Sequence, residues 1–418
     1  MSKVLVVGKG GREHALIRAC VESTSETEVF AWPGSDAIFD LAKPTPVTDF
    51  DSLVEWIGGG NVDLVVAGEE AWLVYGEGLA NACERLGVPC WGPKKEAAQL
   101  EASKEFAKEF MVRHNIPTGG YVTVDNIADA RAAIGDSYPC VLKFDGLAAG
   151  KGVAVCPDSV AAEEFLDEVF TTRRFGEGRL VVEEFLTGPE VSIFVSVVDG
   201  EYQILTPARD YKRLADGDLG PNTGGMGAVA GRSLLDAETL AIIEETAVKR
   251  TVEGLQKDGL QYRGFLYFGF MLTPEGPKLL EYNCRFGDPE CQAVMPLVSG
   301  DFTSYVMSGA KGKLDTSLID FSSDWSVCLV AASAGYPASS RNGDVIRGLD
   351  EVTGARVYHA GTKKNEAGEF ATNGGRVLAV VAQGATRQDA VAAAYEQFNK
   401  VDFDGSQRRT DIGTANFD

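Results

Sequence analysis

Three polar residues recur at every second position near residue 280 and offer the chemistry of a metal or phosphate site. Glu281, Asn283 and Arg285 lie within the run Leu280–Phe286. Because side chains of a β-strand alternate between its faces, the three point the same way if the strand extends that far. A carboxylate beside an amide oxygen offers the hard ligands that Mg²⁺ prefers, with ATP phosphates filling the remaining positions, and an arginine holds a carboxylate or phosphate. A solvated sheet face would show the same alternation.

A lysine and a glycine-rich loop form a second candidate site. Lys143 ends an apolar run and leads into Gly146–Gly152, a loop that includes Gly150 and Lys151. A loop with few side chains can close over a polyphosphate and present backbone N–H groups to it, while the lysines add positive charge. A flexible hairpin is the alternative, although a lysine at the end of an apolar run needs a partner. No Gly-Lys-Ser/Thr sequence opens a helix here, so the loop is not a Walker A motif.

The N-terminal glycine cluster lies where a strand passes into a helix. Gly8, Gly10 and Gly11 precede Arg12 and Glu13. Free backbone N–H groups and the positive end of the helix dipole attract phosphate at such a junction. Glu13 stands where a dinucleotide fingerprint has its third glycine, which argues against a nicotinamide oxidoreductase. We predict a site for a single phosphate, to which Arg12 adds charge; a tight turn that needs glycine is the alternative.

The segment Glu183–Glu190 joins two predicted strands and offers a place for a nucleoside. Extended backbone can pair with the edge of an adenine ring while apolar side chains enclose the ring, and Glu190 can accept hydrogen bonds from ribose hydroxyls. A plain surface turn explains this segment equally well.

The elements that must position these residues fall into three stretches of the chain. The first hundred residues alternate strand and helix, which is typical of a parallel sheet whose ligands gather at the carboxyl ends of its strands. This stretch contains predicted strands 3–7, 63–67 and 88–91, a helix that follows Glu13 and runs through Cys20, and a helix over roughly 77–87. The middle contains predicted helices 103–114 and 236–257, strands 139–144, 153–156, 180–184 and 191–198, a long loop over 209–231, and a hairpin of 265–272 with 278–283. From about 325, strands 327–332, 356–359 and 376–382 and helix 386–400 indicate a compact α+β domain.

Composition excludes several classes of protein. The 418 residues carry a formal net charge of −22 and no compact Lys/Arg run, which works against nucleic-acid binding. No segment approaches the ~20 apolar residues of a membrane-spanning helix, and no signal-peptide pattern precedes the first strand. The eight cysteines form no Cys-x-x-Cys pair, which favours reduced structural thiols. We expect a cytoplasmic monomer without nucleic-acid or membrane partners.

In their order along the chain these motifs resemble the ATP-grasp superfamily, whose members phosphorylate a carboxylate and let a nucleophile displace the phosphate. More specifically, five segments are similar to the phosphoribosylamine–glycine ligase family, also called glycinamide ribonucleotide synthetases. They are Gly10–Ala15, Lys143–Gly152, Pro221–Gly227, Asn283–Glu290 and Thr372–Leu378. The likeness covers nearly the whole chain, and the third and fourth segments are highly specific.

The resemblance implies a fold and an activity. The fold would be a multidomain α/β and α+β protein: an N-terminal substrate-binding parallel-sheet domain (1–102), an ATP-grasp domain (103–324) with a mobile lid at about 120–190, and a small C-terminal α+β domain (325–418). The activity would join glycine to phosphoribosylamine through glycyl phosphate, with ATP as the energy source and Mg²⁺ or Mn²⁺ as the cofactor, in purine biosynthesis.

Carried over by position, the implied site residues fall into four groups. Those for ATP are Lys104, Lys143, Gly150, Lys151, Gly152, Glu183, Leu186 and Glu190. Those for phosphoribosylamine and other substrates are Gly8, Gly10, Gly11, Arg12, Glu70 and Asp210. Glu281 and Asn283 would hold the metal, and Asp210 and Arg285 would lie near the reacting groups.

The chain departs from the family pattern at three places. Glu69 and Trp72 stand where the family has prolines, which affects the shape of a substrate loop, and Tyr211 stands where it has a histidine. Many ATP-grasp enzymes carry a further metal carboxylate on the preceding strand, but Phe265–Phe270 contains none. We therefore expect fewer contacts between protein and metal.

Two rival functions remain open at this point. Another ATP-grasp enzyme, such as a purine-pathway carboxylase or a formyl-transferring ligase, would turn over ATP without glycine. A nucleotide-sensing protein would bind ATP and release no phosphate with any set of substrates.

Overall fold

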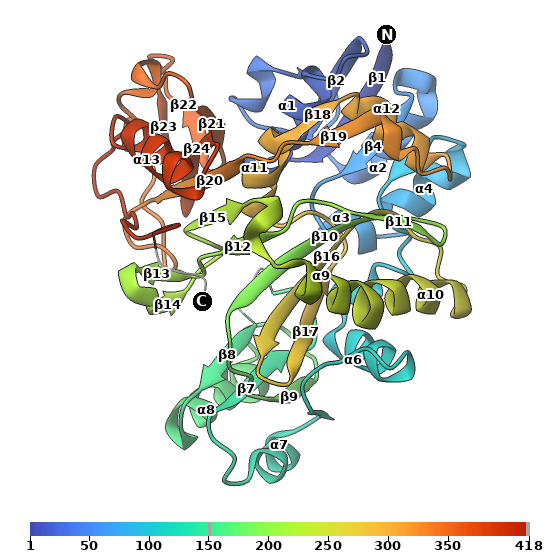
Figure 1. Ribbon diagram of the computed structural model, residues 1–418, viewed down its shortest axis with the longest axis vertical. Coiled ribbons are helices and arrows are strands. Elements are labelled where there is room, and N and C mark those ends of the chain that lie inside the picture. Colours follow the sequence, from blue (N-terminus) through green and yellow to red (C-terminus); the bar gives the residue numbers. More distant parts are fainter. Residues whose placement is uncertain (149–151, 415–418) are drawn as a thin grey trace.

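The computed structural model describes residues 1–148 and 152–414. Figure 1 shows the N-terminal unit at the upper right, the C-terminal strands at the upper left and a smaller lobe at the bottom, with the central strands between them.

The apolar strands of the first hundred residues form a five-stranded parallel sheet in the order β3-β2-β1-β4-β5. Val4–Val7 and Leu64–Val66 have no exposed surface, because elements cover both faces of the sheet. The elements of this unit are β1 (Ser2–Gly8), α1 (Gly11–Val21), β2 (Thr27–Pro33), β3 (Lys43–Pro44), α2 (Phe50–Trp56), β4 (Leu64–Ala67), α3 (Ala71–Val74), α4 (Leu79–Leu86), β5 (Cys90–Trp91) and α5 (Gln99–Ala102). The predicted parallel sheet is confirmed, and the carboxyl ends of β1 and β4 lie side by side.

The lower lobe is a four-stranded antiparallel sheet in the order β6-β9-β7-β8. Its elements, with the helix that precedes it, are α6 (Lys104–Arg113), β6 (Tyr121–Val124), α7 (Ile127–Ile134), β7 (Cys140–Phe144), β8 (Val153–Cys156), α8 (Ser159–Leu166) and β9 (Leu180–Glu184). Leu142, Phe144, Phe165 and Leu180 belong to a core cluster of this lobe, distinct from the larger ones above it. A lobe with its own core can move as a unit relative to the rest.

The central sheet has nine strands and joins the middle of the chain to its end. The main strand order is β17-β16-β10-β12-β15-β20-β24-β21, with β11 paired to β10. Its strands are β10 (Glu190–Val198), β11 (Glu201–Ile204), β12 (Ala208–Asp210), β15 (Gly227–Ala230), β16 (Arg263–Thr273), β17 (Gly276–Asn283), β20 (Trp325–Ala332), β21 (Arg356–His359) and β24 (Arg376–Gly384). Because β15 pairs with β20, the C-terminal strands continue the central sheet instead of forming a separate one.

The predicted long loop over 209–231 is wrong. This stretch contains β12, β13 (Arg213–Ala215), β14 (Leu219–Asn222) and β15. β15 is fully buried and made of small residues, and a Cβ at Gly227 would lie 2.6 Å from the Cys328 carbonyl oxygen. Short strands of small residues show no alternation of polar and apolar side chains, so their composition resembles that of a loop.

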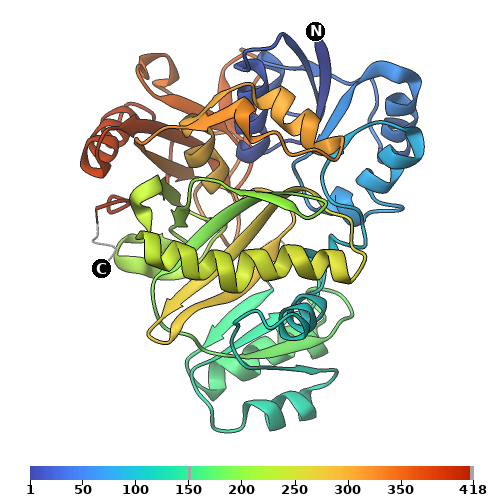
Figure 2. The same ribbon diagram turned by 45° about the vertical axis from the view of Figure 1, so that its right-hand side comes forward.

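A long helical stretch covers the central sheet (Figure 2). It consists of α9 (Ala237–Ile243), a π-helical turn (Glu244–Val248) and α10 (Lys249–Lys257), which confirms the predicted helix over 236–257. Asp236 caps its first turn by accepting a hydrogen bond from the Thr239 N–H at 2.8 Å.

The remaining elements belong to two places in the fold. They are α11 (Glu290–Val294), β18 (Val298–Gly300), α12 (Phe302–Ala310), β19 (Ile319–Phe321), β22 (Thr362–Lys364), β23 (Phe370–Thr372) and α13 (Arg387–Phe398). The first four of them in chain order follow β17, and α11 and α12 pack against α1 of the N-terminal unit, whereas the last three lie in the C-terminal unit. All eight cysteines are buried free thiols, as predicted. Within residues 1–148 and 152–414 no helix combines the length and apolar character needed to cross a bilayer.

Candidate active site

A cavity of about 370 Å³ lies where the parallel sheet, the lower lobe and the central sheet meet. The predicted residues that line it are Arg12, Glu70, Lys104, Lys143, Gly152, Glu183, Asp210, Glu281, Asn283 and Arg285. Gly8, Gly10, Gly11, Leu186 and Glu190 are not among its lining residues. Gly150 and Lys151, which were predicted to contact ATP, lie outside the described residues.

Two lysines in the cavity wall share one buried carboxylate. Lys143 Nζ on β7 lies 2.9 Å from Glu183 Oε1, and Lys108 Nζ on α6 lies 2.9 Å from Glu183 Oε2. Burial lowers the pKa of Lys108 to about 8, although Glu183 opposes the shift. Burial alone would raise the pKa of Glu183, but the charges of Lys143 and Lys108 lower it. The group carries one net positive charge at neutral pH, which suits a phosphate. In this conformation both Glu183 oxygens bind lysines.

Lys104 holds the start of the glycine-rich loop. Its Nζ donates to the Gly146 carbonyl at 2.9 Å, and its backbone N–H donates to Asp145 Oδ1 at 2.6 Å. Ser103 caps the same helix, α6, by accepting from the Phe106 N–H at 3.1 Å. The loop that was predicted to close over a polyphosphate is therefore anchored at its first residues to the helix that carries Lys104.

The candidate metal ligands lie at the end of β17. Glu281 and Asn283 line the cavity, but the strand ends at Asn283, so Arg285 reaches the cavity from beyond it. A carboxylate and an amide oxygen suit Mg²⁺. Among the described residues no three His, Cys, Asp or Glu side chains form a metal-binding cluster. The donor set therefore fits an ion that completes its coordination with phosphate oxygens and water. On the neighbouring strand β16 the residue opposite Asn283 is Tyr267, so this strand adds no carboxylate there.

A chain of alternating charges runs along the wall on the N-terminal side. Arg285 lies 3.2 Å from Glu70 and 2.6 Å from Glu101, and Arg12 lies 3.7 Å from Glu70. Burial alone would raise the pKa of Glu70, but the charges of Arg285 and Arg12 outweigh it and lower the pKa to about 2. Burial raises the pKa of Glu101 to about 7, although Arg285 opposes the shift. This wall thus presents two fixed guanidinium groups beside the metal ligands.

The N-terminal turn differs from the expected phosphate cradle. The Gly10 N–H donates to Glu13 Oε2 at 2.7 Å, and Arg12 Nε donates to Glu13 Oε1 at 2.6 Å. Gly8 has φ +140°, and a Cβ there would lie 2.4 Å from Glu13 Cγ. Gly8 and Gly10 therefore make room for the Glu13 side chain, which accepts from the Gly10 amide in this conformation. Arg12 is the part of the turn that reaches the cavity.

Two carboxylates form an acidic corner on the opposite side. Asp210 on β12 and Glu290 on α11 line the cavity, and Ser192 Oγ donates to Glu290 Oε1 at 3.0 Å. Burial and the charge of Glu290 raise the pKa of Asp210 well above its usual value, and burial likewise raises the pKa of Glu290. Asp210 Oδ1 is buried with no hydrogen-bond partner among the described residues. A ligand ammonium group would satisfy this corner.

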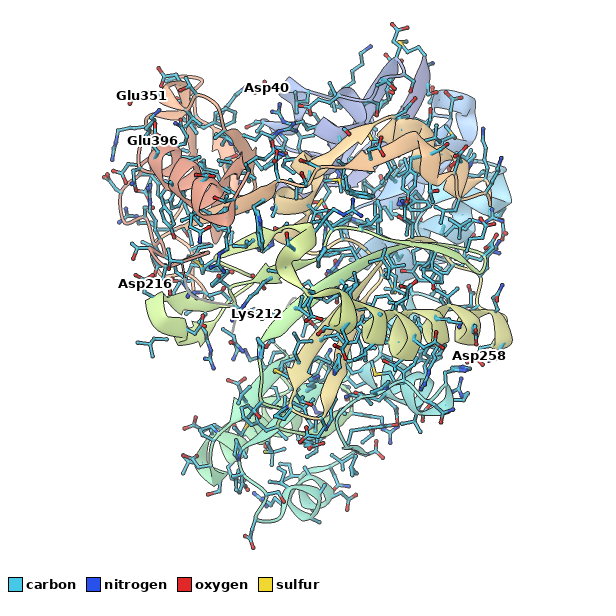
Figure 3. The ribbon with its side chains drawn as sticks, viewed as in Figure 1. Asp40, Lys212, Asp216, Asp258, Glu351 and Glu396 are labelled. Carbon is cyan, nitrogen blue, oxygen red and sulfur yellow. The ribbon has the colours of Figure 1, made fainter. Side chains whose placement is uncertain are left out.

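Glu190 is connected to the cavity through a neighbour. It forms an ion pair with Lys212, which lines the cavity. Figure 3 shows Lys212 between the central sheet and the lower lobe, and its side chain is 34% exposed. Leu186 is buried, and a Cβ at Gly119 would lie 3.4 Å from its Cδ1. A nucleoside would therefore meet Lys212 as well as the predicted Glu190.

The replacements of family prolines and histidine have clear structural consequences. The Trp72 ring stacks on Phe50 at 5.5 Å and meets Trp32 edge-on at 4.7 Å, and its Nε1–H donates to Glu69 at 3.2 Å. This aromatic cluster holds the loop with Glu70 still facing the cavity. Tyr211 Oη instead accepts from the Gly413 N–H at 3.0 Å, away from the cavity lining.

Several cavity residues were not predicted from the sequence. They are Glu101, Lys108, Lys212, Glu290 and Arg376. Glu290 and Arg376 lie within two of the five family-like segments, so those segments could have indicated them. Arg376 donates to the Asp288 carbonyl at 2.6 Å and so brings the C-terminal strands to the site. Lys108 and Glu101 lie in helices whose sequence gives no such signal.

Two antiparallel sheets that enclose paired lysines and a carboxylate–amide pair define this chain as an ATP-grasp protein. Models of the phosphoribosylglycinamide synthetase N domain, ATP-grasp (A) domain and C domain match residues 2–101, 102–291 and 326–415. The chain belongs to the phosphoribosylglycinamide synthetase family.

Individual relatives agree with this assignment. The chain is 43% identical to a phosphoribosylamine–glycine ligase of Caldanaerobacter subterraneus, with 99% of the chain and 100% of the relative covered. The crystal structure of phosphoribosylamine–glycine ligase from Thermotoga maritima matches with a TM-score of 0.86 at 34% identity, over 98% of this chain and 100% of that one. The biotin carboxylase domain of Hydrogenobacter thermophilus 2-oxoglutarate carboxylase shares the fold alone: 18% identity and a TM-score of 0.74, over 97% and 91% of the chains.

Proposed function

We propose that this protein joins glycine to 5-phosphoribosylamine, with conversion of ATP to ADP and phosphate, to give glycinamide ribonucleotide for purine biosynthesis. The observation that carries the proposal is one cavity in which three groups meet: the lysines on Glu183, the Glu281–Asn283 oxygens, and the Asp210–Glu290 corner. Family membership and near full-length likeness to named ligases support it.

The nucleotide would lie between the lower lobe and the central sheet. Lys143 and Lys104 would contact its phosphates, and Glu190 with Lys212 would meet the nucleoside. Glu281 and Asn283 would hold Mg²⁺, which supplies positive charge against the phosphate oxygens. The segment 120–190 would act as a lid, because it has a separate core and carries the glycine-rich loop. Its closure would keep water from an acyl phosphate.

The acidic corner would bind glycine by its ammonium group. Asp210 and Glu290 would then direct the glycine carboxylate toward the γ-phosphate, and an oxygen of that carboxylate would attack phosphorus and displace ADP. The guanidinium groups of Arg12 and Arg285 lie on the N-terminal side, where they would face phosphoribosylamine. Its amine would attack the carbonyl carbon of glycyl phosphate, form the C–N bond, and release phosphate.

The test is phosphate release measured with ATP, Mg²⁺ and freshly generated phosphoribosylamine, with and without glycine. The proposed ligase releases phosphate with the complete set and forms glycinamide ribonucleotide in equal amount. Turnover that is independent of glycine would indicate another ATP-grasp enzyme. Binding of ATP without phosphate release from any set would indicate a nucleotide sensor.

Glu290→Gln tests the glycine corner. We expect the KM for glycine to rise about 10- to 100-fold, because a neutral amide replaces one partner of a charge-assisted hydrogen bond worth ~1.5–3 kcal/mol. The KM for ATP should stay within about twofold, since the nucleotide contacts lie on other elements. Steady-state titration of each substrate checks this. A parallel rise in both KM values would mean that Glu290 supports the whole cavity instead of glycine.

A further inference from the structure

Glu101 holds three consecutive residues at the end of β17. It lies at the end of α5 in the N-terminal unit, and its side chain is 6% exposed. Its Oε2 accepts from the Cys284 N–H at 2.6 Å, and its Oε1 lies 2.6 Å from Arg285 Nη2. The third residue is Asn283: one atom of its side-chain amide lies 3.1 Å from the same Oε1, and a hydrogen bond forms there when that atom is the nitrogen. One carboxylate from another unit thus fixes the strand end that carries a candidate metal ligand.

The contacts of Asn283 determine which way its amide is turned. On one side its neighbours are the acceptors Glu101 Oε1 and the Tyr282 carbonyl, at 3.1 and 3.0 Å, and on the other side they are donors. An amide that satisfies these contacts donates from its nitrogen to both acceptors, which places its oxygen on the opposite side of the group. Only that oxygen can coordinate Mg²⁺, because an amide N–H₂ has no lone pair to offer.

We infer that Glu101 is a positioning residue for the metal: it turns the oxygen of Asn283 toward the ion by accepting from its nitrogen. The inference rests on the proposed function, because that function places a metal at Glu281 and Asn283. Hydrogen bonds behind a metal ligand commonly change metal affinity 10- to 100-fold when they are removed. A purely structural Glu101 would act through its ion pair with Arg285 and the hydrogen bond from the Cys284 N–H, and Glu70 forms the other ion pair of that arginine.

The experiment measures Mn²⁺ binding by electron paramagnetic resonance of free Mn²⁺ in the presence of ADP, without the other substrates. We expect Glu101→Gln to raise the Kd for Mn²⁺ about 10- to 100-fold. Glu70→Gln is the matched control: it also removes a carboxylate from Arg285 but does not contact Asn283, so its Kd should remain within about threefold. Equal effects of the two substitutions would overturn the inference.

An exchange of donor and acceptor provides an independent check if Glu101→Gln folds poorly. Asn283→Asp alone places two carboxylates against each other and should weaken Mn²⁺ binding. In the double variant Glu101→Gln/Asn283→Asp the residue at 101 can donate to the one at 283, and we expect Mn²⁺ affinity to recover to within about threefold of wild type. If Mn²⁺ affinity does not recover in the double variant, or does not change in Glu101→Gln, the inference about Glu101 is overturned and the proposed function is not. Failure of the wild-type protein to bind Mn²⁺ with ADP would overturn the proposed function as well.

Discussion

Replacement of Lys143 by methionine is expected to reduce the rate of phosphate release about 10²- to 10³-fold, the usual loss when one preorganised electrostatic contact to a transition state is removed. Lys143 is the last but one residue of β7 and lines the cavity, and its ammonium group lies 2.9 Å from Glu183 and 3.2 Å from the carbonyl of Leu280, on the strand that carries Glu281. Methionine keeps most of the side-chain volume and removes the charge that would offset the transferring phosphoryl group. A coupled assay of ATP turnover measures the effect.

A second effect must be separated from the first. Loss of Lys143 leaves buried Glu183 with Lys108 as its remaining lysine partner, and breaking a buried ion pair costs up to about 3–5 kcal/mol. Lys143→Met leaves a neutral Glu183–Lys108 pair, so we expect a protein that still folds, with a lower melting temperature and a low turnover per folded molecule. If turnover per folded molecule were normal in this variant, Lys143 would have only a structural role.

Local patterns predicted the parts of the fold that depend on neighbours in sequence. The continuous apolar runs of β1 and β4 and the turn at Thr273–Gly276 each indicated their structure. The cavity residues Lys143, Glu281 and Asn283 were found for the same reason, because a charged residue at the end of an apolar strand is visible in a single segment. These three residues meet at one cavity because β7 and β17, the strands that carry them, both end there.

Contacts between distant segments could not be predicted in this way. Glu101 meets Cys284 across 183 positions of sequence, and nothing in its own helix marks it as a partner of a strand end. The Gly10 amide was predicted to be free for a phosphate, but Glu13, read only as a missing glycine, folds back to accept from it. β15 was read as loop because its identity as a strand comes from pairing with β20.

Two buried histidines join the N-terminal unit to the C-terminal strands, and we expect them to make the folded protein less stable in acid. The His359 N–H on β21 donates to His14 Nδ1 on α1 at 3.1 Å, and the two rings stack at 5.9 Å. Their exposed fractions are 8% and 3%. Burial lowers the pKa of His14 to about 3 and that of His359 to about 4, and Arg18 adds to both shifts. Two further charges oppose each other: Asp40, labelled in Figure 3 near the junction of the two units, raises the pKa of His359, and Lys364 lowers it.

The sign of the effect follows from these shifts. Both histidines have a lower pKa in the folded chain than the unfolded value of about 6.5. The unfolded chain therefore binds more protons below that pH, and stability is complete above about pH 6.5 and falls as the pH drops toward the folded pKa values. Near pH 5 the two residues together should lower the free energy of unfolding by about 2.7 kcal/mol per pH unit, since one bound proton corresponds to about 1.36 kcal/mol per unit.

Proton uptake on unfolding measures this contribution directly. Unfolding in guanidinium chloride at pH 5.0 should take up about two more protons in the wild-type chain than in His14→Gln/His359→Gln, while at pH 8.0 the two chains should not differ. Glutamine retains a hydrogen-bond acceptor at position 14 and does not titrate, so the difference isolates the imidazoles from the many carboxylates that also bind protons near pH 5. Equal uptake by both chains at pH 5.0 would mean that the histidines are already charged in the folded protein and that their burial does not destabilise it in acid.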